Sequence, residues 1–395
     1  YKICDYTMKV YDWIVVGGGI TGAALGYELS RQGLSVLILD QHPTLEGATR
    51  YSYGGLAYWS GTSRLTRVLC QEAREIYQSL SEELETDTQF RELDLLLTID
   101  FKDDSEQLAA DYARFATPPT WLSVEDACAI EPLLNQNAIA GAFTVRHGHI
   151  HPGKTTQGYL KAFRRCGGEI QIARVVELVS SSDTIKAVKT VAATYHTANT
   201  VVCAGGLSRT LLKASGIPVY LYFTHEEMIE TPRVDIHLQT MVIPADTKRF
   251  QLEQQASTKS VEHLWDEPGH EVIRPILDAG AVQFLDGSLR MGQLSRVLTD
   301  PYATIAPEKG EAEIRTQVGK ILPALEKLPG TWHHCLVAFS NTSLPVVGSL
   351  SGVEGVYIFS GFTNPLVCVP PLAKRFANWV QGQEDEIIAK LSPPN

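Results

Sequence analysis

The sequence has little positive charge and no long apolar run, and each shortage argues against a class of protein. Lysine and arginine number 34 against 45 aspartates and glutamates, which gives a net charge of −11. This balance argues against a nucleic-acid or anionic-membrane surface. No apolar stretch reaches the roughly 18 residues of a membrane-spanning helix, so we expect no membrane span.

Cysteine is present but unorganised. The seven cysteines form no CxxC pair and no cysteine–histidine set at zinc spacing. His333, His334 and Cys335 are adjacent rather than spaced, so one metal ion could not easily take all three, and we predict no metal site. Scattered thiols without a disulfide framework favour a reducing, cytoplasmic setting.

The length of 395 residues exceeds one typical core and favours two domains. There is no internal repeat, heptad pattern or low-complexity tract. Residues 1–7 precede the first methionine, Met8, and we expect them to be a leader or an added segment outside the fold.

The most informative segment, residues 13–40, reads as one βαβ unit built to hold a dinucleotide. Ile14–Val16 is a short apolar run typical of a buried parallel strand. Gly17 permits a tight turn, Gly19 lets backbone approach a pyrophosphate, and Gly22 allows the helix to pack against the strand. Asp40 ends a second apolar strand, where a carboxylate can accept hydrogen bonds from a ribose.

Because a strand, a helix and a terminal acid surround the GxGxxG pattern, a dinucleotide site is a better interpretation than an ordinary glycine-rich turn. The helix directs its N-terminal N–H groups at phosphates, and Gly33 ends it. Asp40 argues against NADP, whose 2′-phosphate a carboxylate would repel. The unit alone leaves NAD and FAD both open.

The remaining pattern predicts an α/β fold: a Rossmann-like domain plus an α+β substrate domain with a mostly antiparallel sheet. A helix is expected over 63–84 and another near 155–166. Asp286-Gly287 predicts a hairpin turn. The dinucleotide domain is predicted to be discontinuous, at 8–88, 146–216 and 331–385, with the substrate domain at 89–145 and 217–330.

The order of these elements resembles the glycine oxidase, sarcosine oxidase and D-amino-acid oxidase family of FAD enzymes. Four stretches carry the resemblance: Gly17–Asp40 with Gly47-Ala-Thr49 and Gly54-Gly55; Ser60–Arg67; Gly148 to Pro152 with Val201–Gly206; and Leu344–Gly348 with Val356–Asn364. The resemblance implies FAD rather than NAD, because the last strand and helix would meet the pyrimidine end of a flavin.

The resemblance also implies which residues hold the cofactor. Backbone around Val175 or Val176 would contact adenine, Thr49 would lie near the pyrophosphate, and Gly361–Val367 would offer N–H groups to reduced flavin. The full predicted set is Gly17, Gly19, Ile20, Thr21, Gly22, Asp40, Gln41, Thr49, Gly54, Gly55, Val175, Val176, Ala204, Gly205, Gly361, Phe362, Thr363, Asn364, Leu366, Val367 and Cys335.

Arg64 and Arg67 match the two arginines of the sarcosine-oxidase motif and are the predicted catalytic residues. By resemblance Arg64 lies near the flavin and Arg67 grips a substrate carboxylate with its planar fork. The alternative is two solvated arginines at a helix start.

Two basic residues found at the active sites of the resembled enzymes are missing from this sequence. Val337 stands where glycine and D-amino-acid oxidases carry a carboxylate-binding arginine, and Cys368 stands where sarcosine oxidases carry a lysine. Arg67 would then work alone, Arg290 or Arg296 would substitute, or the substrate has no α-carboxylate.

Cys335 falls where sarcosine oxidases attach the flavin covalently, although we favour non-covalent FAD and a free buried thiol. His149 and His151 are interpreted as structural. The aromatic residues Tyr51, Tyr53, Tyr58 and Trp59 fit either core or flavin pocket, and nothing in the sequence fixes roles for Glu226, Glu227 or Trp265.

Together these features predict an FAD-dependent oxidoreductase that oxidises the C–N bond of a small amine or amino acid to an imine, with O₂ as acceptor giving H₂O₂. A dehydrogenase of a 2-hydroxy or amino acid that passes electrons to a quinone or carrier is the first alternative. A flavin-binding protein with a decayed active site is the second.

Overall fold

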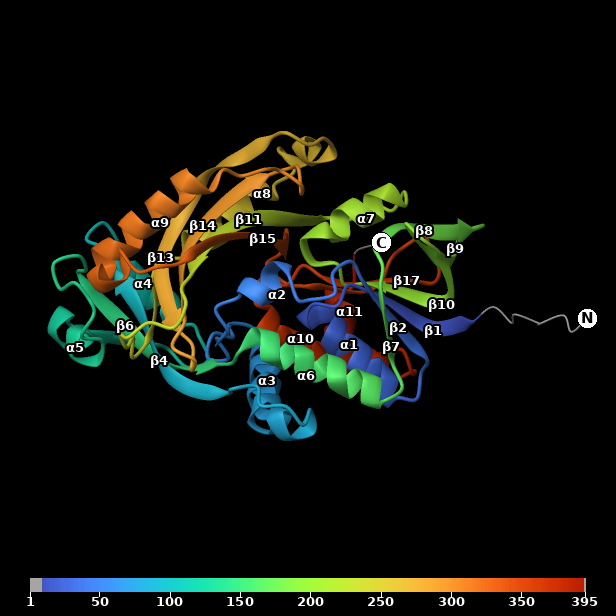
Figure 1. Ribbon diagram of the computed structural model, residues 1–395, viewed down its shortest axis with the longest axis horizontal. Coiled ribbons are helices and arrows are strands. Elements are labelled where there is room, and N and C mark those ends of the chain that lie inside the picture. Colours follow the sequence, from blue (N-terminus) through green and yellow to red (C-terminus); the bar gives the residue numbers. More distant parts are fainter. Residues whose placement is uncertain (1–8, 394–395) are drawn as a thin grey trace, which may run out of the picture.

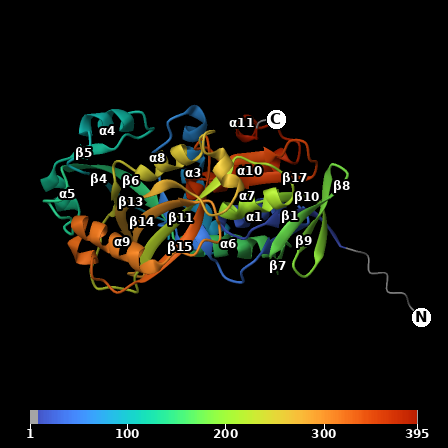
Figure 2. The ribbon, with the colours of Figure 1, turned by 90° about the horizontal axis from the view of Figure 1, so that it is seen from above.

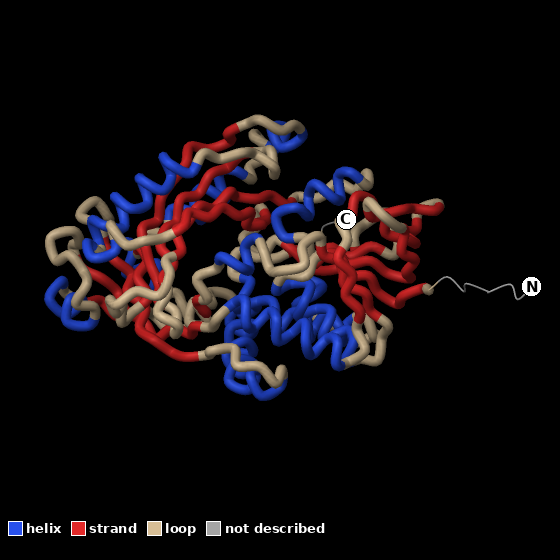
Figure 3. Tube along the Cα trace, viewed as in Figure 1, coloured by secondary structure: helices blue, strands red, loops and turns tan. Residues whose placement is uncertain are grey.

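A computed structural model describes residues 9–393, and the leader predicted at residues 1–7 lies outside the described residues. The chain forms two large sheets, each with its own helices (Figure 1). The strands of the two sheets make two separate groups, with a block of helices below the first (Figure 3). This arrangement confirms the predicted α/β fold with a second, mostly antiparallel sheet.

The first sheet is built around five parallel strands in the order β17-β10-β1-β2-β7. Strand β16 adds antiparallel to β17, and the β8–β9 hairpin joins through β10. Its strands are β1 (Val10–Val16), β2 (Val36–Asp40), β7 (Glu169–Ile172), β8 (Val175–Ser181), β9 (Thr184–Thr190), β10 (Thr194–Val202), β16 (Val346–Ser349) and β17 (Val356–Ser360).

Strand β1 is buried on both faces, as its continuous apolar sequence predicts. Trp13 and Val15 belong to a core shared with several helices, whereas Ile14 and Val16 belong to a second core on the opposite face. A parallel strand covered on both sides cannot show polar alternation. The longest helices of the first core are α1 (Ile20–Arg31), α3 (Arg64–Glu83), α6 (Pro152–Arg165) and α10 (Pro365–Trp379).

Two helix predictions are close to the observed bounds. The helix expected over 63–84 is α3, and Ser63 caps it by accepting a hydrogen bond from the Thr66 N–H. The helix expected near 155–166 is α6, which begins earlier, at Pro152. His151 caps it through its ring, and proline suits the first helical position, where no N–H is needed.

The second sheet runs β15-β11-β14-β13-β12-β4-β6-β3, with β5 paired to β6. All its pairs are antiparallel except β12 with β4. The predicted Asp286-Gly287 turn does join β13 to β14, which confirms the hairpin. The strands are β3 (Gly55–Leu56), β4 (Arg91–Ile99), β5 (Thr120–Leu122), β6 (Gly141–His149), β11 (Leu221–Glu230), β12 (Met241–Pro244), β13 (Glu271–Gln283), β14 (Leu289–Leu298) and β15 (Thr331–Ser340).

The two faces of the second sheet have different surroundings. Helix α9 (Pro307–Ile321) packs its apolar side on one face, which we call the outer face. The short helix α2 (Gly47–Tyr51) lies against β15 from the other side, here called the inner face, which is turned toward the first sheet (Figure 1). The other helices are α4 (Ser105–Tyr112), α5 (Val124–Ile130), α7 (Ser208–Ala214), α8 (Lys248–Ala256) and α11 (Glu386–Leu391).

The sheet to which each strand belongs bears on the predicted division into two domains, but the domain boundaries remain a prediction. Residues 331–340, assigned above to the dinucleotide domain, form β15 and pair along their length with β11 in the second sheet. Strand β6 likewise belongs to the second sheet. Seen from above, α4 and α5 lie at one end of the molecule and β8 and β9 at the other (Figure 2).

Candidate active site

The turn after β1 has the close packing that the glycine pattern requires. Gly17 adopts φ +110°, a conformation that side chains disfavour. A Cβ on Gly22 would lie 1.8 Å from the Gly17 carbonyl oxygen, and a Cβ on Gly17 would lie 2.4 Å from the Cys203 oxygen at the end of β10. No larger residue fits here, so the backbone of α1 can approach a ligand closely.

Thr49 lies at the N-terminus of α1. Its hydroxyl accepts a hydrogen bond from the Ile20 N–H at 3.1 Å, one of the helix donors without an intrahelical partner. Thr21 donates to the Cys203 carbonyl at 3.2 Å, which ties the helix start to β10. The side chain of Ile20 is buried in the core, so only its backbone can serve a ligand.

Asp40 closes the same corner from the end of β2. Its Oδ2 accepts the Gly18 N–H at 2.6 Å, and its Oδ1 accepts the His42 N–H at 2.8 Å. The carboxylate is therefore fixed beside the glycine turn, while Gln41 is exposed. Nearby, Ala204 and Gly205 follow β10, and Val175 and Val176 begin β8.

The loop before α10 is the second segment, after the glycine turn, whose backbone could bind a ligand. Gly361 adopts φ +77°, where its Cβ would lie 2.7 Å from Leu221. The side chains of Phe362, Leu366 and Val367 are buried in the core. Asn364 precedes α10 without a side-chain cap, so the backbone N–H groups of the first turn are available to an anion.

Around Gly54 and Gly55 the chain packs against two buried histidines. His149 Nε2 lies 2.9 Å from the Tyr53 carbonyl oxygen, and His147 Nδ1 accepts the Trp59 indole N–H at 2.9 Å. Burial lowers the pKa of each imidazole to about 3, so both rings are neutral near pH 7. These contacts are structural, in line with the interpretation of His149 above.

Arg64 and Arg67 lie at the exposed start of α3. The Arg67 guanidinium donates to the carbonyls of Gly61 and Arg114, at 3.3 and 3.0 Å. Within residues 9–393, neither arginine forms a hydrogen bond or ion pair with the 361–364 loop. Their predicted catalytic role stays a prediction.

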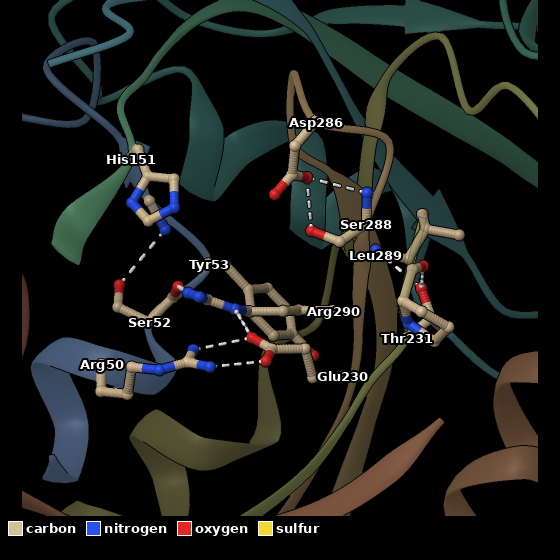
Figure 4. Close-up of polar contacts among 12 residues, drawn as sticks. Arg50, Ser52, Tyr53, His151, Glu230, Thr231, Asp286, Ser288, Leu289 and Arg290 are labelled. Atoms are coloured by element: carbon tan, nitrogen blue, oxygen red, sulfur yellow. Dashed lines mark hydrogen bonds and ion pairs between the residues drawn. The ribbon is translucent and has the colours of Figure 1, made fainter. Parts of the chain in front are cut away.

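The two substitute cations suggested by the sequence are both paired elsewhere. Arg290 binds Glu230, which also receives two hydrogen bonds from Arg50 at 2.8 and 2.6 Å (Figure 4). Burial alone would raise the pKa of Glu230, but the Arg50 hydrogen bonds and the Arg290 charge hold it at about 2. Arg296 is paired with Glu227, 2.5 Å away beneath α9.

A third arginine, Arg249 of α8, is the cation that the sequence analysis missed. Its Nη2 donates to the Thr363 carbonyl at 3.4 Å, so it touches the 361–364 loop. Its Nε lies 3.5 Å from Glu253 Oε1, and its charge also acts on Glu226. No local motif surrounds Arg249; only the i,i+4 pairing with Glu253 could have drawn notice to it.

Strands β11 and β15 bring three predicted or undecided positions onto the inner face, namely Glu226, Cys335 and Val337. Glu226 of β11 is level with Ser295 and Cys335 on its two neighbours, and Val337 is level with Thr224. Successive residues point to opposite faces, so Glu227 points outward. Burial raises the pKa of the Cys335 thiol, which keeps it protonated near pH 7. Covalent flavin attachment there stays a prediction.

The remaining undecided aromatic residues divide between core and inner face. Tyr58, Trp59 and Trp265 are buried in three apolar clusters. Tyr51 of α2 instead stacks on His333 of β15, with ring centroids 4.5 Å apart.

Comparison with known proteins decides the family. The model of the DAO family, described as FAD dependent oxidoreductase, matches residues 12–379. The chain belongs to this family. The predicted resemblance, FAD as cofactor and the enzyme class of oxidoreductase are thereby confirmed.

Individual DAO-family relatives are distant. The chain is 22% identical over 376 residues to a 4-methylaminobutanoate oxidase (formaldehyde-forming) of Paenarthrobacter nicotinovorans, which covers 93% of this chain and 43% of the relative. It is 22% identical over 400 residues to human mitochondrial dimethylglycine dehydrogenase, which covers 96% and 44%. The chain thus spans less than half the length of these curated relatives.

The fold has a close match among solved structures. Glycine oxidase from Geobacillus kaustophilus superposes with a TM-score of 0.80 at 21% identity, covering 97% of this chain and 98% of that one. At this identity the likeness establishes the fold alone. Among the described helices, none is long and apolar enough to cross a membrane.

Proposed function

We propose that this protein is an FAD-dependent enzyme that oxidises the C–N bond of a small amine to an imine, which water hydrolyses to a carbonyl product. The observation that carries the proposal is Arg249, a largely buried cation hydrogen-bonded to the loop where the family resemblance puts the flavin. A positive charge at that point favours reduction of a flavin to its anionic form.

The described residues fit the cofactor. Asp40 would hold the adenosine ribose, the N-terminus of α1 with Thr49 would hold the pyrophosphate, and the uncapped N-terminus of α10 would face the pyrimidine ring. When bound, FAD supplies a two-electron acceptor for a hydride equivalent from the carbon beside the nitrogen.

The protein itself supplies position and electrostatics. The reacting carbon must lie close to the flavin with its amine unprotonated, so that the nitrogen lone pair can form the C=N bond. The inner face of β14, β11 and β15 would hold the rest of the substrate. On this assignment Arg249, rather than Arg64, provides the charge expected near the flavin.

The electron acceptor and cellular setting are finer parts of the proposal. O₂ would take two electrons and two protons to give H₂O₂, while a quinone or protein carrier is the alternative. The six described cysteines are free thiols, which supports a cytoplasmic setting.

An anaerobic screen tests the chemistry. The purified yellow protein is mixed with amines, amino acids and 2-hydroxy acids, and bleaching of the visible flavin band is recorded before and after air is admitted. We expect amines to bleach the band and air to restore it with release of H₂O₂. Bleaching by hydroxy acids alone would contradict the proposal.

A matched pair of variants tests the cofactor site. Asp40→Ala should weaken FAD binding, whereas Asp12→Ala, which removes a carboxylate bonded to Ser35 at the opposite end of the strands, should not. Equal FAD dissociation constants, measured by fluorescence titration of the apoprotein, would contradict the assignment of Asp40.

A further inference from the structure

Carboxyl groups outnumber cations in the cluster around Arg249. Three carboxylates from three elements surround one guanidinium: Glu226 of β11, Glu253 of α8 and Asp278 of β13 all act on Arg249. Glu226 is 2% exposed and Glu253 is 4% exposed, so water screens neither well. Burial raises the pKa of all three carboxyl groups, so near pH 7 the cluster carries less negative charge than three ionised carboxylates would give.

The three carboxylates differ in how their oxygens are satisfied. Asp278 accepts the backbone N–H groups of Lys248 and Arg249 at 2.9 and 3.0 Å, so it caps the start of α8. Glu226 Oε2 accepts Gln293 Nε2 at 2.6 Å and Ser295 Oγ at 2.7 Å, and the Thr224 hydroxyl also acts on this carboxyl group. Asp278 is therefore structural, and Glu226 is only half satisfied.

The other two oxygens are the unusual ones. Glu226 Oε1 and Glu253 Oε1 are buried and accept no hydrogen bond from the residues described, although Glu253 Oε1 lies 3.5 Å from Arg249 Nε as its ion-pair partner. A buried carboxylate oxygen without a donor is costly, and native proteins rarely keep one without a ligand or water to satisfy it. Both carboxyl groups act on the charge of Arg249, which in turn touches the Thr363 carbonyl.

The usual carboxylate anchors are absent near Arg249, and Arg50 and Arg290, farther along the same face, are already paired with Glu230. Val337, on this face, is apolar, and Cys368, in α10, is a thiol whose pKa is raised by burial. Arg249 already lies beside Glu253 and Glu226, so an incoming carboxylate would meet two like charges there. A cation would instead meet two acceptors.

From this geometry we propose that the substrate is an aliphatic amine with a second, non-reacting nitrogen that carries positive charge and with no α-carboxylate, as in a diamine. The Oε1 atoms of Glu226 and Glu253 accept the hydrogen bonds of that ammonium group. This inference rests on the proposed amine oxidation and names its substrate class. Oxidation of the C–N bond at the other nitrogen leaves the ammonium unchanged.

The first experiment compares three amines of equal chain length. Butane-1,4-diamine, butylamine and ornithine are tested by anaerobic flavin reduction. Because a charge-assisted hydrogen bond strengthens binding by about 10- to 100-fold, we expect kcat/KM for the diamine to exceed that for butylamine by that factor. Ornithine, with its added carboxylate, should react more slowly than butylamine. Equal values for diamine and butylamine, or a preference for ornithine, would overturn the inference.

The second experiment uses adjacent glutamates as a matched pair. Glu226→Gln and Glu253→Gln should each lower the diamine-to-butylamine ratio of kcat/KM by about 10-fold. Glu227→Gln, on the outer face, should leave the ratio unchanged. Because the ratio is independent of the fraction of folded protein, a loss of stability does not mask the result. An unchanged ratio in both inner-face variants contradicts the inference.

A binding measurement separates this inference from the proposed function. The dication of 2,5-dimethylhexane-2,5-diamine keeps the N–H donors of an ammonium group but has no hydrogen on the carbons beside nitrogen and cannot form an imine, so it tests the acidic face through thermal stabilisation of the protein. We expect it to stabilise wild type more than acetate does, and to lose this effect in Glu226→Gln. If the dication binds but no amine bleaches the flavin, the proposed oxidation fails while the cation site stands. If amines bleach the flavin but the dication gives no stabilisation, the cation site fails alone.

Discussion

Glu226 and Glu227 are neighbours in β11 with the same side chain and with opposite surroundings. Glu227, on the outer face, is fully buried, pairs with Arg296 and accepts the Trp332 indole N–H at 3.1 Å. Glu226, on the inner face, keeps one oxygen without a donor. The outer face pairs its charge within the sheet beneath α9, whereas the inner face leaves one carboxyl oxygen without a donor, as a binding surface does.

The largest expected effect is on stability, at the outer face. Glu227→Ala leaves the Arg296 charge buried and unpaired, so we expect it to reduce the free energy of unfolding by about 3–5 kcal/mol. Glu226→Ala should cost less, about 1–2 kcal/mol, because it leaves the neutral donors Gln293 and Ser295 unpaired while Arg249 keeps Glu253 as its ion-pair partner. Urea unfolding of both variants measures the difference, and equal losses would show that the two faces do not differ as described.

The next effect concerns Arg249 and catalysis. Arg249→Ala should lower kcat by about 100-fold, because one preorganised charge at the reacting group contributes on that scale. Arg67→Ala should lower it less, since its guanidinium binds backbone carbonyls at the surface. Stopped-flow flavin reduction makes the comparison, with Arg249→Lys as partial rescue. A larger loss in Arg67→Ala would restore the sarcosine-oxidase assignment of that residue.

A smaller effect is expected where α9 covers Glu227. A Cβ on Gly310 would lie 1.9 Å from Glu227 Oε1, so Gly310→Ala should displace α9 and cost about 1–3 kcal/mol. The exposed neighbour Lys309 provides the control, because Lys309→Ala removes no buried contact. Thermal unfolding of both variants is the measurement. Stabilisation by Gly310→Ala, as in an ordinary helix interior, would contradict the tight packing.

The smallest effect is a change with pH at the inner face. Burial raises the pKa of Glu253 to about 7, against the charge of Arg249 and with the help of Glu226. Ionised Glu253 binds a cation better, so the diamine-to-butylamine ratio of kcat/KM should rise as pH increases through about 7. Glu253→Gln should remove this rise. A ratio independent of pH in wild type would show that Glu253 does not face the substrate.

The same raised pKa has a consequence for stability with a definite sign. Between the ordinary value of 4.5 and about 7, the folded state holds the Glu253 proton more tightly than the unfolded state. This contribution is therefore fully present below pH 4.5 and is lost as pH rises through about 7. Binding of a cation would offset the loss, which links substrate affinity to stability on this face.

The sequence was enough to predict those elements whose conformation depends on residues close together in the chain. The GxGxxG turn, its helix and the terminal Asp40 lie within 28 residues and form as predicted, because glycine conformation and strand burial depend on near neighbours. The Asp286-Gly287 hairpin and helix α3 follow for the same reason. The choice of FAD also came from the sequence, through the order of motifs along the whole chain.

The sequence by itself determined the dinucleotide turn, the two kinds of sheet and the absence of the usual carboxylate anchors. Only the tertiary structure decided which charges meet: Arg249 reaches Thr363, 114 residues away, and Glu226 is separated from Glu227 by the plane of a sheet. Nothing in a strand's pattern says which face a helix will cover. Charge pairing between distant elements depends on that choice, and the inner and outer glutamates differ because α9 packs on only one side.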